Sequence, residues 1–173
     1  MRRLIMVLAL VLGMSSMAMA QNYALVNSEK VFKSVASYNS AIEELDKLAQ
    51  SYQAEVDEKF KAVENLYNAY MQRKSQLSEA SQAANEENIL KKEQEATEFQ
   101  ESLFGTDGEL MKKRLELIQP IQKMVFGAIE EYAKAKGYDM VIDISQNATM
   151  LYYSPKADHT EAIIAELKKK IQQ

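Results

Sequence analysis

The strongest periodic signal in this chain lies in residues 31–84, which read VFKSVASYNSAIEELDKLAQSYQAEVDEKFKAVENLYNAYMQRKSQLSEASQAA. Steps of alternately four and three residues from Val31 meet apolar side chains, and only Lys59 and Arg73 interrupt them. A period of 3.5 residues that lasts for about seven heptads without Gly or Pro is typical of a coiled-coil seam. The stripe comprises Val31, Val35, Tyr38, Ile42, Leu45, Ala49, Tyr52, Val56, Val63, Leu66, Tyr70, Leu77, Ala80 and Ala84.

A second stripe of the same kind follows the polar stretch 78–88. Two stripes of similar length on either side of a polar stretch predict an antiparallel helical hairpin, which we assign to residues 39–117 with its tip near 78–88. Arms of about 45 residues would each reach about 70 Å, so the hairpin should project from the rest of the chain. The second stripe comprises Ile89, Lys92, Ala96, Phe99, Leu103, Thr106, Leu110, Lys113, Leu117, Ile121 and Met124.

Three residues of the second arm are poor helix formers. Gly105 and Gly108 each cost about 1 kcal/mol relative to Ala in a helix interior, so we expect a bend or a non-helical turn there. Pro120 is expected to kink the same arm. Beyond Pro120 the apolar face widens, which indicates burial against more than one neighbour.

The segments on either side of the hairpin, residues 21–38 and 118–173, predict a small β/α body. The first segment has a strand-like run at 23–26, followed by Asn27 as a helix N-cap. In the second segment, Gly137 suits the end of a helix, and strands are expected at 138–144 and 148–153. The fold class is therefore α+β, mostly α, with a long coiled-coil hairpin projecting from a small sheet and a C-terminal helix.

The C-terminal helix is indicated by its caps. Asp158, with Glu161 three residues later, forms an aspartate variant of the capping box, and Lys168–Lys170 suit the negative end of the helix. Three short strands and this helix supply little core for a chain of this length, so we expect oligomerisation. The residues expected to form the body core or the contact between copies are Leu25, Val26, Ile121, Val125, Ile129, Tyr138, Val141, Ile142, Leu151 and Tyr152.

The first twenty residues predict a cleavable signal peptide. Arg2 and Arg3 precede an apolar run, and Ala18-Met19-Ala20 is a signal-peptidase pattern, so cleavage is expected after Ala20. No later segment approaches about 20 uncharged residues, so we expect no stable membrane insertion. The chain has no cysteine, which excludes a lipoprotein anchor, disulfides and thiol chemistry.

The charge and the reactive residues exclude two classes of function. Removing the two leader arginines leaves 19 Lys and Arg against 25 Asp and Glu, a net charge of −6, which does not suit nucleic acid. The one histidine, His159, is expected to be exposed in the first turn of a helix. Asp139 and Asp143 would lie about 13 Å apart along a strand, too far for shared acid–base chemistry. We therefore expect no catalytic, cofactor-binding or metal site.

Segments at both ends of the chain identify a family. They are Leu25–Asn27 and Lys30–Phe32, Pro120 with Ile121, Gly137–Asp143, and Leu151–Pro155 with Asp158–Thr160. Their order around a coiled-coil hairpin resembles the Skp/OmpH family of periplasmic chaperones, and with the leader the resemblance covers essentially the whole chain. It implies a periplasmic homotrimer whose helical tentacles enclose a cavity, in which unfolded outer-membrane proteins are held without ATP and kept from aggregating. The number three comes from the resemblance, because the mixed seam composition fixes no oligomer number.

The mature chain departs from this family in its charge. Well-known members are strongly basic, which suits the capture of acidic clients and lipopolysaccharide, whereas this chain is acidic, so we assign no lipid site. The nearest approach to a basic patch is formed by Arg73, Lys74, Lys91 and Lys92. Because glutamates are interspersed among these residues, we interpret them as an ordinary solvated helix face.

Several apolar residues of the hairpin lie outside the strict seam and are candidates for contact with a client. Met and Tyr adapt to varied partners, which suits low-specificity binding. The same residues could instead widen the seam as packing. The alternative function is a structural coiled-coil adaptor of the envelope that binds one folded partner. The client-contact candidates are Phe60, Tyr67, Met71, Leu90, Phe104 and Met111.

Overall fold

The computed structural model describes residues 22–146 and 149–172. The chain divides into two compact units, and the described parts of Met1–Val31 and Phe126–Gln173 form the first, which we call the body unit. Phe32–Val125 forms the second, which we call the hairpin unit. The predicted signal peptide and its cleavage site after Ala20 lie outside the described residues.

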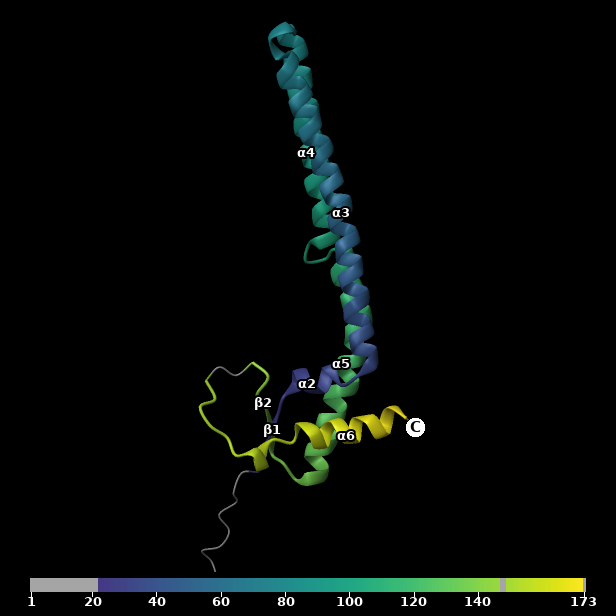
Figure 1. Ribbon diagram of the computed structural model, residues 1–173, viewed down its shortest axis with the longest axis vertical. Coiled ribbons are helices and arrows are strands. Elements are labelled where there is room, and N and C mark those ends of the chain that lie inside the picture. The colour runs from purple at the N-terminus through teal and green to yellow at the C-terminus, as the bar shows by residue number, and fades with distance from the viewer. Residues whose placement is uncertain (1–21, 147–148, 173) are drawn as a thin grey trace, which may run out of the picture. The chain divides into compact units, whose positions relative to one another are not determined.

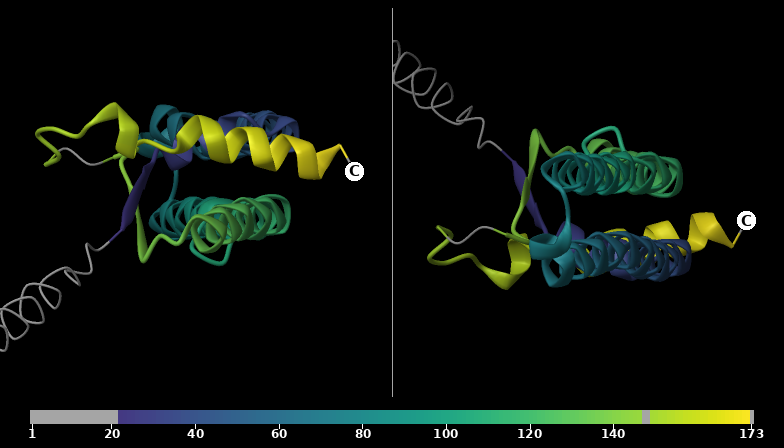
Figure 2. Two further views of the ribbon diagram at one scale, coloured as in Figure 1. Left: turned by 90° about the horizontal axis from the view of Figure 1, so that it is seen from below. Right: turned by 90° about the horizontal axis from the view of Figure 1, so that it is seen from above.

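The hairpin unit consists of two antiparallel helical arms. The short helix α2 (Ser28–Lys33) leads into α3 (Ala36–Arg73), which is the first arm. The second arm is formed by α4 (Glu79–Phe104) and the first part of α5 (Glu109–Lys136). The two arms run side by side in Figure 1. Figure 2 views the hairpin from its ends and shows the two arms as separate helical rods. The predicted helical hairpin is therefore confirmed.

The predicted seam is where the two arms bury their side chains. Val56 and Tyr70 of α3 are buried, as are Ala96 and Leu103 of the second arm. Lys59, which interrupts the apolar stripe, places its Nζ atom 4.5 Å from the centroid of the Phe99 ring. A cation–π contact thus replaces an apolar contact at this seam position.

The chain reverses direction in the 3₁₀ turn η1 (Lys74–Gln76). Ser78 is the N-cap of α4, and its side chain accepts a hydrogen bond from the backbone N–H of Ser81 at 3.3 Å. Most of the polar stretch 78–88 is therefore helical. Its alanines and glutamates are good helix formers, so low hydrophobicity there does not break the helix.

The second arm is interrupted at residues 105–108, as the two glycines predict, and a loop protrudes from the hairpin there (Figure 1). A Cβ atom on Gly105 would lie 2.5 Å from the carbonyl oxygen of Glu101, and one on Gly108 would lie 2.7 Å from that of Leu103. The contacts Tyr52–Phe104 and Glu44–Lys113 on either side of the loop keep nearly the same antiparallel register. The break in the helix therefore hardly shifts the register of the two arms. By contrast, α5 continues through Pro120.

The body unit is built on two parallel strands, β1 (Tyr23–Val26) and β2 (Met140–Asp143), with Ala24 opposite Val141 and Leu25 opposite Ile142. Parallel strands need a long connection, which the inserted hairpin supplies. Helix α6 (Thr160–Ile171) follows the 3₁₀ turn η2 (Pro155–Ala157). The core of the unit contains Leu25, Ile163 and Leu167, whose side chains are at most 1% exposed.

The strand predicted at 148–153 is absent from the part of this segment that the structure describes, residues 149–153. Leu151 is 98% exposed and Tyr152 is 82% exposed. A strand needs a partner edge, and the free edge of β1 is occupied elsewhere, since Leu25 forms a bridge with Asp158. The described residues therefore contain a sheet of two strands where three were expected.

The predicted caps lie close to their expected places. Asn27 Oδ1 accepts from the backbone N–H of Lys30 at 3.0 Å, and Gly137 has a φ of 71° at the end of α5. Helix α6 begins at Thr160, and Asp158 Oδ1 accepts from the backbone N–H of Thr160 at 2.9 Å, which replaces the predicted bond with Glu161. The Thr160 hydroxyl also accepts from the backbone N–H of Asn27 at 2.9 Å, which ties α6 to the end of β1.

Candidate functional site

An apolar surface lies on one side of the hairpin unit. The salt bridge between Lys74 Nζ and Glu86 Oε1, at 3.0 Å, joins the two arms on this side. Residues three or four positions apart on a helix are neighbours, so stepping along each arm from these two residues follows the same side. We call this surface the lateral face, and it comprises Phe60, Glu64, Tyr67 and Met71 of α3 with Leu90 and Glu93 of α4.

The lateral face exposes three of the predicted client-contact residues. Tyr67 and Met71 are each 49% exposed, and Leu90 is 65% exposed. In the antiparallel register given by the Lys59–Phe99 and Tyr52–Phe104 contacts, Leu90 lies level with Tyr67, so these side chains form one patch. Phe60 is half-buried beside the seam. The structure therefore brings four of the six candidates onto one surface.

The patch adjoins an ordered turn. The hydroxyl group of the buried Tyr70 donates a hydrogen bond to Glu86, and Lys74 Nζ lies 5.2 Å from the Tyr70 ring centroid. The pKa of Tyr70 is raised, chiefly because burial disfavours its phenolate and also because it donates to Glu86. The pKa of Glu86 is lowered by the hydrogen bond from Tyr70 and then by Lys74. Gln82 Nε2 completes the turn by donating to the carbonyl oxygens of Lys74 and Leu77.

The other two candidates lie nearer the open end of the hairpin. Phe104 packs edge-on against Tyr52 with ring centroids 6.3 Å apart, and it is half-buried. Met111 is 41% exposed. Both line a cavity of about 190 Å³ whose other lining residues are Leu45, Asp46, Ala49, Leu110 and Arg114. Phe104 therefore contributes to the packing of the two arms, and only part of its side chain is available for contact with a client.

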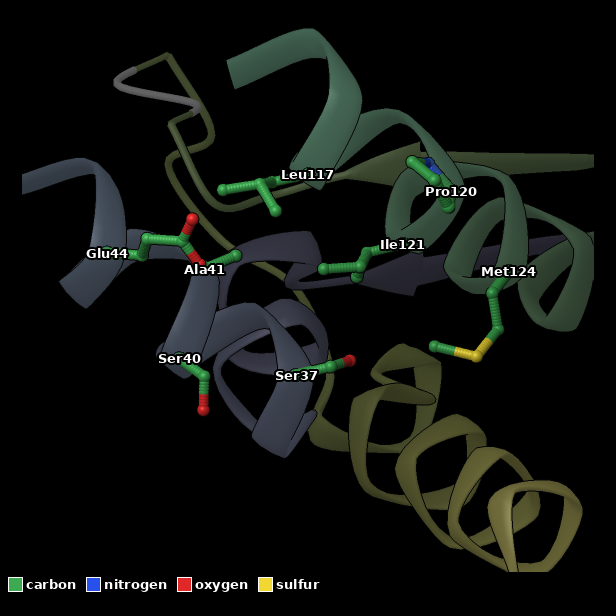
Figure 3. Close-up of a pocket in the computed structure, with 8 residues that line it drawn as sticks. All are labelled: Ser37, Ser40, Ala41, Glu44, Leu117, Pro120, Ile121 and Met124. Carbon is green, nitrogen blue, oxygen red and sulfur yellow. The ribbon is translucent and has the colours of Figure 1, made fainter. Parts of the chain in front are cut away.

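A larger cleft of about 590 Å³ lies between the start of α3 and the middle of α5. In Figure 3, Leu117 and Ile121 project from α5 toward α3, and Met124 lies at the other end of the row. Ile121, an expected core residue, is 7% exposed. The cleft is mostly apolar on the α5 side and polar on the α3 side. The residues that line it are Ser37, Ser40, Ala41, Glu44, Leu117, Pro120, Ile121 and Met124.

The residues expected in the body core or in the contact between copies fall into three groups. Leu25, Val26 and Val125 are buried within the single chain, as is Ile121. A second group is half-buried and comprises Ile129, Tyr138, Val141 and Ile142. Leu151 and Tyr152 contribute nothing to the core of a single chain, because they are almost fully exposed.

The expectation that His159 is exposed is wrong. It is half-buried, and its ring lies between two tyrosine hydroxyls, that of Tyr132 at 3.0 Å from Nδ1 and that of Tyr138 at 2.8 Å from Nε2. Its backbone N–H donates to the carbonyl oxygen of Leu25 at 2.8 Å. Burial raises the pKa of Tyr132 above its ordinary value. His159 therefore connects α5, β1 and α6, and no periodic pattern in the sequence could have signalled this long-range cluster.

The two aspartates of the predicted second strand have separate structural roles. Asp139 Oδ2 accepts from the backbone N–H of Asn22 at 3.1 Å. Asp143 Oδ1 accepts from the backbone N–H groups of Ser28, at 3.1 Å, and Ser145, at 2.9 Å. Burial is the largest single effect on the pKa of Asp143, and it raises this pKa. The hydrogen bonds from Ser28 and Ser145 lower the pKa and together outweigh burial, so the pKa lies below its usual value. Asp139 thus holds the residue before β1 in place, and Asp143 holds the start of α2.

Two features are absent from residues 22–146 and 149–172. In these residues, no helix combines the length and apolar character needed to cross a membrane. The same residues hold no group of three or more His, Cys, Asp or Glu side chains arranged to bind a metal ion.

The comparisons with known proteins agree with this architecture. A protein of Aquifex aeolicus strain VF5, described as uncharacterized, is 29% identical over 170 residues, which cover 98% of each chain. A crystal structure of a candidate outer membrane chaperone (OmpH-like) from Caulobacter crescentus CB15 superposes with a TM-score of 0.62 at 17% identity, covering 88% of this chain and 86% of the other. The family model described as outer membrane protein (OmpH-like) matches residues 22–167. Because that match spans most of the chain, the protein belongs to the OmpH-like family.

Proposed function

We propose that this protein is an ATP-independent holdase chaperone of the periplasm, which binds unfolded outer-membrane proteins and prevents their aggregation. Membership of the OmpH-like family and the name of the Caulobacter structure support a chaperone role. The observation that carries the proposal is the exposed patch of Tyr67, Met71 and Leu90 on the lateral face. Adaptable apolar side chains on a helical surface bind unfolded chains weakly and without strict sequence requirements.

The proposed binding mode needs no catalytic group. Apolar contact with a client is reversible and releases the client when a better-packed state forms, so no nucleotide cycle is required. Each exposed side chain would contribute about 1 kcal/mol or less, because such a contact is only partly desolvated. Several contacts along an arm would then sum to useful affinity while each remains easily broken.

We further propose that the protein acts as a homotrimer after removal of the leader. The body unit leaves Leu151, Tyr152, Tyr23 and Met140 with 45% or more of their surface exposed, although they belong to a small sheet and the segment near it. Large apolar side chains gathered on such a unit are typical of a surface that another subunit covers. Several copies would also place several lateral faces around one client.

The test is to dilute a urea-unfolded outer-membrane β-barrel protein into buffer without ATP and to follow aggregation by light scattering. The mature protein should suppress aggregation, and it should not bind the folded barrel. Leu90→Gln should weaken suppression, whereas the matched control Leu115→Gln, at an apolar residue of α5 that is 48% exposed and lies off the lateral face, should not. Unchanged aggregation with several clients would instead favour an envelope adaptor that binds a folded partner.

A further inference from the structure

The negative charge of the chain is concentrated in the hairpin unit. Phe32–Val125 contains 12 Lys and Arg against 17 Asp and Glu, a net charge of −5. The described residues of the body unit contain 7 Lys and Arg against 8 Asp and Glu, a net charge of −1. The acidic character of the protein therefore belongs to the part that carries the lateral face.

Half of the ten lysines of the hairpin unit form a salt bridge with a nearby carboxylate. Lys47 binds Glu43, Lys92 binds Glu95 and Lys112 binds Glu109, all with N–O distances of 2.6–2.8 Å. On the lateral face itself, Lys74 is paired with Glu86. These lysine charges are thus neutralised within the chain.

The carboxylates beside the apolar patch are not neutralised. In the described structure, the side chains of Glu64, Glu87 and Glu93 form no hydrogen bond or salt bridge. Glu64 lies one turn from Tyr67, while Glu87 and Glu93 lie one turn on either side of Leu90. The antiparallel register also places Glu64 level with Glu93, one on each arm. Among the described residues, neither Lys61, one turn from Glu64, nor Lys91, one turn from Glu87, forms a salt bridge, so the carboxylates at the rim of the patch keep their negative charge.

We propose that the lateral face selects unfolded segments in which apolar or aromatic residues alternate with Lys or Arg. This inference rests on the proposed function and specifies its client class. Burial of the client's apolar side chains against Tyr67, Met71 and Leu90 supplies attraction, and the client's cations meet Glu64 and Glu93. An acidic segment would place like charges together, which disfavours its binding.

The geometry suits an extended chain. Successive turns of α3 place Glu64, Tyr67 and Met71 about 5 Å apart along the helix axis. Alternate residues of an extended chain are about 6.6 Å apart and face the same side. A segment lying along the hairpin can therefore present an apolar residue to Tyr67 and a basic residue to Glu64 within two positions of each other.

Salt should separate the two contributions. Exposed charges are screened beyond about 8 Å at physiological ionic strength, so the ionic part of binding weakens as salt rises. The apolar part does not weaken in this way. A client rich in Lys should therefore lose more affinity in salt than one whose basic residues are replaced by Gln.

The experiment uses the mature full-length protein and three unstructured 20-residue peptides with a neutral dye at one end. All carry the same Leu and Phe residues, and the remaining charged positions are Lys in the first, Gln in the second and Glu in the third. Affinities are measured by fluorescence anisotropy at low and high NaCl. We expect the Lys peptide to bind about three- to tenfold more tightly than the Gln peptide at low salt, and the Glu peptide to bind most weakly.

Two variants remove the same charge from different places. E64Q/E93Q should abolish the preference for Lys over Gln while leaving binding of the Gln peptide unchanged. The matched control E55Q/E58Q neutralises two carboxylates of α3 that lie off the lateral face, and it should keep the preference. Equal loss in both variants would overturn the proposed site, because only net charge would then matter.

The outcomes also separate this inference from the proposed function. If aggregation is suppressed but the three peptides bind equally, selection by charge is wrong and the holdase proposal stands. If no peptide binds and aggregation is unchanged, both proposals fail. If E64Q/E93Q keeps the preference for the Lys peptide, the carboxylates that bind the peptide's lysines do not lie on the lateral face, and the proposed site is wrong.

Discussion

The hairpin unit and the body unit bury their side chains in different ways. In the body unit, Leu25, Ile163 and Leu167 are almost completely buried, and they come from segments far apart in the sequence. In the hairpin unit, burial follows a single seam, and Leu66 on that seam is still 39% exposed. A body held by long-range packing should unfold as a whole, whereas a seam of neighbouring turns can loosen one stretch at a time.

The largest expected effect tests the body. Leu167→Ala removes a side chain that is 0% exposed in the core of the body unit, and such a cavity should lower the free energy of unfolding by about 3 kcal/mol. Ile171→Ala is the control on the same helix, because Ile171 is 52% exposed, and it should change the stability by less than about 0.5 kcal/mol. Urea unfolding followed by circular dichroism measures both. If both substitutions lowered the free energy of unfolding equally, burial of Leu167 would not be what stabilises the packing of α6.

The next effect tests the break in the hairpin against an uninterrupted helix. Gly108→Ala places a Cβ atom 2.7 Å from a backbone carbonyl oxygen that cannot move freely, so the hairpin should lose about 2 kcal/mol. Gly127→Ala, in α5, meets nothing within 4 Å and should instead stabilise the protein by about 0.5–1 kcal/mol through helix propensity. Opposite shifts in the midpoint of urea unfolding are expected. Destabilisation by both changes would contradict the steric account.

The two units also differ in how far the sequence predicts them. The hairpin follows from local periodicity, since the apolar positions from Val31 to Leu77 define one seam and the glycines at 105 and 108 mark its break. The caps at Asn27 and Gly137 are equally local signals, and both are confirmed. Each of these features depends on residues within a few positions of one another, which is why a single sequence suffices.

The body depends on contacts that no local pattern encodes. His159 is expected to be exposed from its place near a helix start, yet Tyr132 and Tyr138 enclose it. Residues 148–153 are expected to form a strand, but a strand also needs a free edge, and the edge of β1 is bridged by Asp158. In the candidate site, the apolar residues could be named from the sequence. Their gathering on one face depends on the register of the arms, which the Lys59–Phe99 and Tyr52–Phe104 contacts give, and on the side that the Lys74–Glu86 pair shares.

The smallest expected effect concerns the acid sensitivity of the hairpin turn. The pKa of Glu86 in the folded protein lies below its ordinary value of 4.5, first because Tyr70 donates to it and then because of Lys74. A carboxyl group with a lowered pKa contributes stability that is present above the unfolded pKa and is lost as the pH falls through the folded pKa. The hairpin turn should therefore weaken below about pH 4.5.

Tyr70→Phe removes the hydrogen bond and keeps the ring. The pKa of Glu86 should then rise toward its ordinary value, so Tm should fall by about 2 °C near pH 6.5 and the difference from the unaltered protein should vanish in acid. Tyr67→Phe is the control, because Tyr67 is 49% exposed and its hydroxyl has no hydrogen-bond partner among the described residues. Thermal unfolding between pH 3 and 7 makes the comparison. A constant difference at every pH would assign the effect of Tyr70→Phe to packing, since only the loss of a charged partner makes stability depend on the protonation of Glu86.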